Sequence, residues 1–188
     1  ASDVYKRQSM CYEGGIRSFV EFIHQRRGLE ALHEDVIYMK GDSGDNVAEV
    51  AMQYNDSYNE LLLSFANNIN TGEGGTHEDG FKQALTRVLN AYARKNNLLK
   101  DSDKNLSGED CREGLTAIIS VKLREPQFEG QTKGKLGNTE MRQVVSAIVT
   151  DKLTTYFEEN PQVARTIIEK AITASRAAEA CLLYTSPS

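Results

Sequence analysis

Apolar residues recur at intervals of three and four along several segments of the chain, which is the spacing of one face of an α-helix. The first such segment follows Gly15 and is predicted to end near Gly28, because glycine commonly ends helices. An unbroken stripe covers residues 81–92 and follows a helix-start signal at residues 76–79, which makes this the strongest helix prediction in the chain. Further helices are predicted from the N-cap pair Ser107 and Asp110, from Asn138, and from Asn160 followed by Pro161.

Other segments alternate between apolar and polar side chains, a pattern that predicts β-strands. They cover residues 36–39, 47–54, 59–67 and 115–123, with a turn at 41–45. Since the first three strands follow one another closely, they are predicted to form an antiparallel meander. Residues 125–137 hold three glycines and a proline without an apolar period, and they are predicted to form a long exposed loop. Helices and strands are interleaved, which indicates an α+β domain.

Composition narrows the class of protein. A chain of 188 residues with 39% apolar and 26% charged residues fits one globular domain. The apolar runs are far shorter than the roughly 20 residues that cross a bilayer, so no membrane contact is expected. The net charge of −5 repels nucleic-acid phosphate overall, and any DNA contact must come from a local basic patch.

Three cysteines and three histidines are too scattered for a disulfide framework, a zinc site or a catalytic triad. They are Cys11, Cys111, Cys181, His24, His33 and His77. The histidines are therefore interpreted as surface or packing residues, no metal site is expected, and a reducing cytoplasm fits the cysteines best. The acidic pairs at 109–110 and 158–159 are interpreted as structural charges at helix ends.

The two ends of the chain differ from the rest. Residues 1–10 and 181–188 are predicted to be non-native flanks around a domain at 11–180. The opening ASDVYKRQ and the closing CLLYTSPS show no helical or strand period and resemble translated sequencing adapters. Ordinary frayed termini are the alternative. The change of sequence after residue 180 is also the expected sign of a truncated helix.

One segment carries candidate chemistry. QFEGQTKGKLGN, residues 127–138, places two lysines and an amide among glycines, which suits anion binding. It departs from a Walker A loop, because three residues separate Gly130 from Gly134 and Leu136 follows Lys135. A self-contained phosphate cradle is not expected. Two interpretations remain: a lysine inserted into a nucleotide site formed elsewhere, or a flexible basic surface loop.

This segment belongs to a wider set of motifs that resembles a known family. The others are YEGGIRSFVEFI, QYNDSYNE, SFANNINTGEGGTHEDGFKQALTRVLNAYARKNNLL and LSGEDCREGLTAIISVKL. Over residues 12–180 the chain resembles the second domain of the gyrase B subunits of bacterial type IIA DNA topoisomerases, and the close alternative is the matching subunit of topoisomerase IV. The resemblance implies a transducer domain with a ribosomal protein S5 domain 2-like fold: a left-handed βαβ crossover, a mixed sheet packed by helices, and a long C-terminal helix.

The resemblance also implies roles for particular residues. Gln131 and Lys133 match the QTK motif of the family, in which both side chains contact the γ-phosphate of ATP and the lysine acts as catalytic contact and switch. Loss of that phosphate would release the lysine, so that ATP acts as a removable latch. These two residues are the expected catalytic and cofactor-binding residues of the chain.

DNA contact is expected on the helix predicted to carry the apolar stripe over residues 81–92. Arg87 matches a family arginine that faces a cavity entered by DNA, and Arg94 lies about two helical turns further on. Contacts to backbone phosphate would carry no sequence preference. Lys95 and Lys100 extend the expected patch. The alternative is that both arginines are solvated charges opposite the apolar stripe.

A gyrase B fragment would work only as part of its parent, an ATP-dependent isomerase that couples ATP hydrolysis to DNA strand passage and negative supercoiling. The resemblance implies ATP and Mg²⁺, bound mainly by an N-terminal domain. The implied partners are DNA and, in an A2B2 complex, the gyrase A protein with a second copy of gyrase B. The resemblance implies a location in the bacterial cytoplasm, with the nucleoid. The chain alone is expected to be inactive. A different class remains open, a stand-alone S5-like nucleic-acid-binding module with strongly salt-dependent binding.

Overall fold

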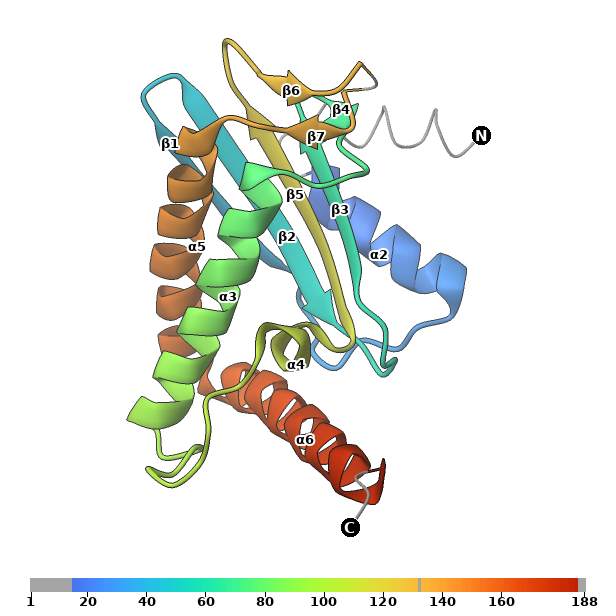
Figure 1. Cartoon of the computed structure of the whole chain (residues 1–188), viewed down its shortest axis with the longest axis vertical. Helices are drawn as coiled ribbons and strands as arrows, with labels where there is room; N and C mark the ends of the chain where they lie inside the picture. Colours follow the sequence, from blue (N-terminus) through green and yellow to red (C-terminus); the bar gives the residue numbers. More distant parts are fainter. Residues whose placement is uncertain (1–14, 132, 186–188) are drawn as a thin grey trace.

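The computed structural model describes residues 15–131 and 133–185 (Figure 1). The helices are α2 (Gly15–Arg27), α3 (Thr76–Lys95), α4 (Gly108–Arg112), α5 (Thr139–Glu159) and α6 (Pro161–Thr185). The strands are β1 (Ile37–Ser43), β2 (Asn46–Tyr54), β3 (Leu61–Ala66), β4 (Ile69–Asn70), β5 (Leu115–Lys122), β6 (Phe128–Glu129) and β7 (Lys135–Leu136). The predicted α+β class is confirmed.

The main sheet is mixed, with strand order β1-β2-β5-β3-β4. β5 pairs antiparallel with β2 and parallel with β3, so it separates the two strands that the sequence pattern placed side by side. The predicted antiparallel meander is therefore wrong beyond the β1–β2 hairpin. The physical reason is burial: residues 115–121 are buried throughout, as a central strand requires, whereas Leu61, Leu62 and Leu63 in β3 are only half-buried.

Helices cover both faces of this sheet (Figure 1). α3 and α5 lie on one face, where Ala117, Ile119 and Val121 of β5 join the larger apolar core. α2 lies on the other face, and its apolar stripe packs against Ile118 of the same strand. Because side chains alternate along a strand, β5 serves both cores at once.

β3 and β5 are parallel neighbours joined by a crossover through α3 and α4. This is a βαβ connection in the mixed sheet that the sequence analysis expected, and its left-handedness stays a prediction. α6 extends over residues 161–185 and contacts α4 and the end of α5. The last element in the described residues is therefore a long helix, as expected.

Several helix-end signals are confirmed. Gly28 follows α2 with a φ of 65°, and the Leu29 N–H donates to the His24 carbonyl at 2.9 Å. The Ser107 hydroxyl accepts from the Asp110 N–H at 3.1 Å and caps α4. α6 begins at Pro161.

Residues 181–185 continue α6, and their assignment to a non-native flank stays a prediction. The predicted flank at 1–10 and residues 186–188 lie outside the described residues.

Residues 125–137 are not a plain exposed loop, since they contain the antiparallel pair β6 and β7 and the fully buried Leu136. Within the described ranges, no helix combines the length and apolarity needed to cross a membrane.

Candidate functional site

The segment that carries the candidate lysine forms a short hairpin near one end of the main sheet (Figure 1). Phe128 pairs with Leu136 and Glu129 pairs with Lys135. Leu136 is fully buried, and Phe128 is half-buried against the larger core. The base of the hairpin is therefore fixed by apolar contacts, and residues 130–131 and 133–134 lie at its tip.

The hairpin docks on the residues that lead into α3. We call residues 71–76 the entry loop. The Glu73 N–H donates to the Gly134 carbonyl at 2.8 Å, and the Leu136 N–H donates to the Gly74 carbonyl at 3.2 Å. These bonds join main chain to main chain immediately after Lys133. The position of the tip is thus tied to the position of the entry loop.

The docking is close enough to require a glycine. Gly75 has a φ of 141°, and a Cβ there would lie 2.5 Å from the Leu136 carbonyl oxygen. The neighbouring Thr76 hydroxyl donates to the Asn138 carbonyl at 2.5 Å. Thr76 is therefore used to hold the hairpin, and α3 has Gly75 rather than a side-chain cap at its start.

Asn138 differs from the sequence expectation in a related way. Its side-chain oxygen accepts no hydrogen bond from the first turn of α5 and instead accepts from the Gln127 N–H at 2.6 Å. Its side-chain amide donates to the Glu125 carbonyl at 3.1 Å and to the Glu140 carboxylate of α5 at 3.0 Å. Asn138 thus closes the base of the hairpin. Its amide is buried, and these bonds supply the hydrogen-bond partners that a buried amide needs.

The predicted phosphate-contacting residues lie at the tip. Gln131 and Lys133 are both exposed, and Lys133 has a φ of 55°. The Lys133 ammonium lies 6.0 Å from the centre of the Phe128 ring. Among the described residues no carboxylate pairs with Lys133, whereas Lys135 pairs with Glu129 at 3.5 Å. The geometry leaves the Lys133 charge available to an anion from outside this domain.

A buried polar cluster lies beneath the entry loop, and sequence reasoning missed it. We call Ser64, Thr71, His77 and Glu78 the Thr71 cluster. The Thr71 hydroxyl is 2.8 Å from the Ser64 hydroxyl and 3.0 Å from His77 Nε2, and Ser64 Oγ is 3.2 Å from a Glu78 carboxylate oxygen. Ser64, Thr71 and His77 are buried. Isolated hydroxyls leave no periodic signal, although the glycine-rich run before α3 marks the place.

The first predicted DNA contact, Arg87, is exposed on α3 where this helix packs beside α5. Its guanidinium donates to the Ser146 hydroxyl at 2.7 Å and to the Thr150 hydroxyl at 3.3 Å. The groove between the two helices is lined by polar side chains that also include Arg142, which is 3.7 Å from Asp79. In the part of the chain that the structure describes, the hydrogen-bond partners of Arg87 are these two neutral hydroxyls, which do not cancel its charge.

The second predicted DNA contact, Arg94, forms hydrogen bonds to other residues of this chain. Its guanidinium donates to the carbonyls of Lys100 and Asp103 at 2.6 and 2.7 Å, and to the Asn105 side chain at 2.8 Å. Such a fork of bonds from one planar group fixes the loop after α3. The structure gives Arg94 a visible structural task that its helical position alone did not reveal.

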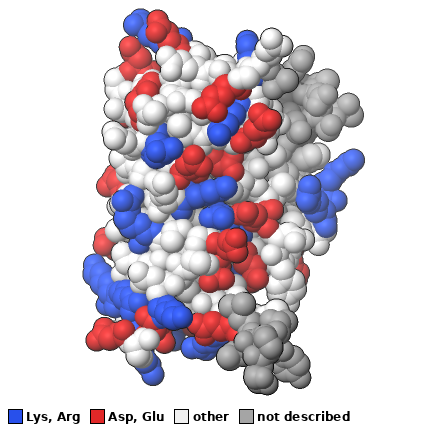
Figure 2. Space-filling model, viewed as in Figure 1, with Lys and Arg blue, Asp and Glu red and all other residues white. Residues whose placement is uncertain are grey.

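Acidic side chains lie beside the lysines around the expected basic patch on α3. Lys95 lies 3.6 Å from Glu158, and Lys82 lies 3.2 Å from Glu78. Figure 2 shows acidic and basic side chains interspersed over the face that it presents. A long-range electrostatic pull on DNA is therefore not a property of this face, and Lys100 is exposed without changing that balance.

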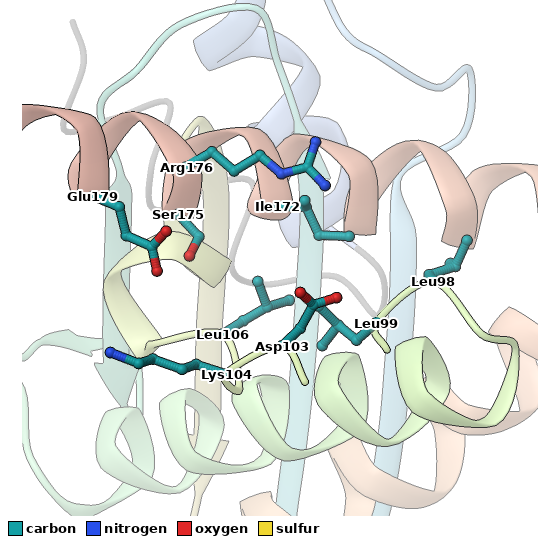
Figure 3. Close-up of a pocket in the computed structure, with 9 residues that line it drawn as sticks. All are labelled: Leu98, Leu99, Asp103, Lys104, Leu106, Ile172, Ser175, Arg176 and Glu179. Carbon is teal, nitrogen blue, oxygen red and sulfur yellow. The ribbon is translucent and has the colours of Figure 1, made fainter. Parts of the chain in front are cut away.

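A narrow pocket lies between α6 and the segment after α3 (Figure 3). Leu99, Leu106 and Ile172 point into it from the two sides, with charged side chains around them. Asp103 already accepts from the Lys100 N–H at 2.8 Å. The pocket lies at the opposite end of the molecule from the hairpin (Figure 1), and it has no part in the site.

The described residues offer no nucleotide cradle and no metal centre of their own. Over residues 15–131 and 133–185, no group of three or more histidine, cysteine or acidic side chains is arranged to hold a metal ion. Burial lowers the pKa of His77 to about 4, and burial also lowers the pKa of His24 and His33. The histidines are neutral packing residues, and phosphate contact by Lys133 and Gln131 stays a prediction.

Comparison with known proteins gives consistent matches. The family model described as DNA gyrase B matches residues 15–181. The DNA gyrase B subunits of Clostridium acetobutylicum and Staphylococcus aureus are 57% and 53% identical over 176 and 172 residues, which is 93% and 92% of this chain. The chain spans only 27% and 26% of the length of these relatives.

Solved structures share the fold. The ATPase domain of Thermus thermophilus gyrase B, crystallised with an aminocoumarin, superposes with a TM-score of 0.83 at 40% identity, over 89% of this chain and 44% of that one. The topoisomerase IV ATP-binding domain of Francisella tularensis, in complex with a small-molecule inhibitor, has a TM-score of 0.75 at 28% identity, with the same coverage.

Proposed function

Because this chain belongs to the DNA gyrase B family, we propose that it is the transducer part of a gyrase B subunit, which couples ATP hydrolysis in a neighbouring domain to DNA strand passage and negative supercoiling. The 57% identity to the Clostridium acetobutylicum gyrase B subunit, against 28% to the topoisomerase IV structure, favours gyrase over that alternative. The whole enzyme would be an isomerase that acts in the bacterial cytoplasm on nucleoid DNA.

One observation carries the proposal: Lys133 is an exposed cation at the tip of a hairpin whose base is bonded to the entry loop. A point charge held at a fixed place can stabilise the terminal phosphate of a nucleotide bound by another domain. Gln131, exposed on the same tip, offers an amide donor beside it. The nucleotide and its Mg²⁺ would be held mainly by that other domain.

The proposed latch depends on the attraction between the Lys133 ammonium and the γ-phosphate of ATP. While the γ-phosphate is present, the Lys133 ammonium is attracted to it and the domain is drawn toward the nucleotide. After hydrolysis and phosphate release, this attraction is lost and the domain is free to move. Movement would pass through the hairpin to the entry loop and α3, where Arg87 would contact DNA phosphate. The gyrase A protein and a second copy of gyrase B, in an A2B2 complex, would supply the remaining sites.

The test uses a chimera in which this chain replaces the matching segment of Clostridium acetobutylicum gyrase B, combined with the gyrase A protein of the same organism. Lys133→Ala is expected to lower ATP turnover about a hundredfold, as loss of one charge-stabilising donor does. Lys135→Ala is the matched control, since it removes a lysine of the same hairpin that pairs with Glu129. Near-normal turnover in the Lys133 variant would refute the proposal.

A further inference from the structure

The entry loop has few means of its own to keep one shape. It contains Gly72, Gly74 and Gly75, and the last two have φ values of 85° and 141°. Glycine has more conformations available when unfolded than any other residue, so such a run is costly to fix. Something else must hold the loop at the position where it meets the hairpin.

The main chain at Thr71 supplies part of this hold. The Thr71 N–H donates to the Ser64 carbonyl at 2.8 Å, and the Gly74 N–H donates to the Thr71 carbonyl at 2.9 Å. The first bond ties the loop to the end of β3, and the second closes a turn. Thr71 is therefore the point at which the loop is attached to the sheet.

The Thr71 side chain attaches the same point to α3. Its hydroxyl has a single proton and is near both the Ser64 hydroxyl and His77 Nε2. If that proton goes to Ser64, the Ser64 proton is shared between the Thr71 carbonyl at 3.0 Å and the Glu78 carboxylate at 3.2 Å, and His77 must donate its Nε2 proton to Thr71. Every hydrogen in the Thr71 cluster is then used.

The unpaired atom of His77 agrees with this arrangement. His77 is fully buried, and its Nδ1 has no hydrogen-bond partner among the described residues. With the proton on Nε2, Nδ1 is a bare acceptor, which is less costly to bury unpaired than an N–H group. Burial also opposes a charged imidazolium. A neutral His77 is therefore fixed in one tautomer by its contact with Thr71.

We propose that the Thr71 cluster is a positioning device: its buried hydrogen bonds fix the entry loop between β3 and α3, and through the loop they set where Lys133 presents its charge. This inference rests on the proposed function of Lys133. Ser64, Thr71 and His77 are buried, so they would not contact nucleotide themselves. They act through the Glu73–Gly134 and Leu136–Gly74 bonds that join the loop to the hairpin.

The test is selective binding by the chimera, measured for a non-hydrolysable ATP analogue and for ADP. Thr71→Val keeps the shape of the side chain and removes its hydroxyl. The expected result is about tenfold weaker binding of the analogue with unchanged binding of ADP, because only the analogue has the γ-phosphate that Lys133 contacts. Thr71→Ser, which keeps the hydroxyl, is expected to restore the affinity to within about twofold.

Controls separate positioning from general damage. Thr155→Val removes a hydroxyl that bonds the Asp151 carbonyl on the exposed side of α5, and it is expected to change neither affinity. Equal losses for the analogue and ADP in Thr71→Val would show general damage and overturn the inference. If Thr71→Val unfolds at the assay temperature, Ser64→Ala decides in its place by the same selective loss or its absence.

The result also separates this inference from the proposed function. Loss of analogue binding in Lys133→Ala together with full binding in Thr71→Val and Ser64→Ala would refute the positioning device alone. Full analogue binding in Lys133→Ala would refute the role of Lys133, and the inference would fall with it.

Discussion

Gly75 lies so close to Leu136 that a Cβ on the glycine would be 2.5 Å from the leucine carbonyl oxygen and 2.6 Å from its nitrogen. Real Cβ atoms do not approach main-chain atoms so closely. The φ of 141° at Gly75 is a second reason for glycine. The union of entry loop and hairpin therefore depends on a residue without a side chain, and this dependence is measurable.

Gly75→Ala is expected to lower the free energy of unfolding by about 3 kcal/mol, since backbone strain and overpacking each cost about 1–3 kcal/mol. Urea unfolding of the chain measures the loss. Gly130→Ala is the control, because Gly130 has a φ of 84° but nothing within 4 Å of an added Cβ. It should show only the strain, about 1 kcal/mol. Equal losses in the two variants would contradict the close docking.

Gly80→Ala tests the crossing of α3 and α5. Alanine is about 1 kcal/mol better than glycine inside a helix, so helix propensity alone predicts a more stable protein. A Cβ at Gly80 would however lie 2.4 Å from the Arg142 carbonyl oxygen of α5. Because neither backbone can move away cheaply, we expect a net loss of about 1–2 kcal/mol.

The control for this crossing is Ala91→Gly, at an exposed position of the same helix. It should cost about 1 kcal/mol, as propensity predicts where nothing else is near. Thermal or urea unfolding compares the two variants. A gain of stability in Gly80→Ala would show that the helices are further apart than the structure has them.

The pKa of His77 predicts a pH dependence of stability. Burial lowers this pKa from 6.5 to about 4, so between these values the unfolded chain binds a proton that the folded chain does not. Stability is therefore fully present above pH 6.5 and falls as the pH falls toward 4, by about 1.4 kcal/mol per pH unit for this group.

His77→Gln removes that group and leaves the other buried histidines. At neutral pH the variant should be less stable, because the contact with Thr71 is disturbed. The difference between wild type and variant should then shrink as the pH falls from 6.5 to about 4. Urea unfolding over this range measures it. A difference that does not change with pH would mean that His77 is already charged in the folded protein.

Arg87 and Arg94 should behave differently in the chimera. Arg87→Gln is expected to weaken binding of duplex DNA and to reduce the salt slope of log K by about one, as the loss of one phosphate contact does. Arg94→Gln should instead cost about 1–2 kcal/mol of stability, since its bonds to the loop at Lys100 and Asp103 are lost. Salt titrations and urea unfolding distinguish these effects. Equal loss of DNA affinity in both variants would restore Arg94 as a contact.

Cys111 is expected to resist alkylation in the folded chain. Burial raises the pKa of its thiol to about 12, so almost no reactive thiolate exists near pH 8. Cys181, which is exposed, provides the internal comparison. Iodoacetamide labelling followed by mass spectrometry should modify Cys181 first and Cys111 only on addition of denaturant. Rapid labelling of Cys111 without denaturant would show that its surroundings open readily.

The helices were predictable from sequence because their signals are local. The stripe over residues 81–92, the Ser107 cap and Pro161 all act within a few residues of themselves, and the structure confirms them. The resemblance to gyrase B came from whole motifs, and the family match confirms it. The exposed tip with Gln131 and Lys133 was also predicted, because two lysines among glycines, Lys133 and Lys135, are easily recognised in a sequence.

The features that the sequence did not predict depend on contacts between segments that are far apart in the chain. Besides β1, β2 pairs with β5, which lies about 60 residues later, and period-two alternation says nothing about which strand pairs with which. β6 and β7 have two residues each, too short to show a period. The Thr71 cluster joins a strand, a loop and a helix through single hydroxyls. Such contacts become visible only when the fold is in place.

The position of β5 between β2 and β3 has a consequence for protein synthesis. Both outer partners leave the ribosome before the strand that joins them, and at about 5–20 residues per second the wait lasts seconds. Until Lys122 has emerged, the edges of β2 and β3 remain unpaired and open to strands of other chains. The rate of translation over residues 67–114 therefore determines how long each newly made copy is at risk of aggregation.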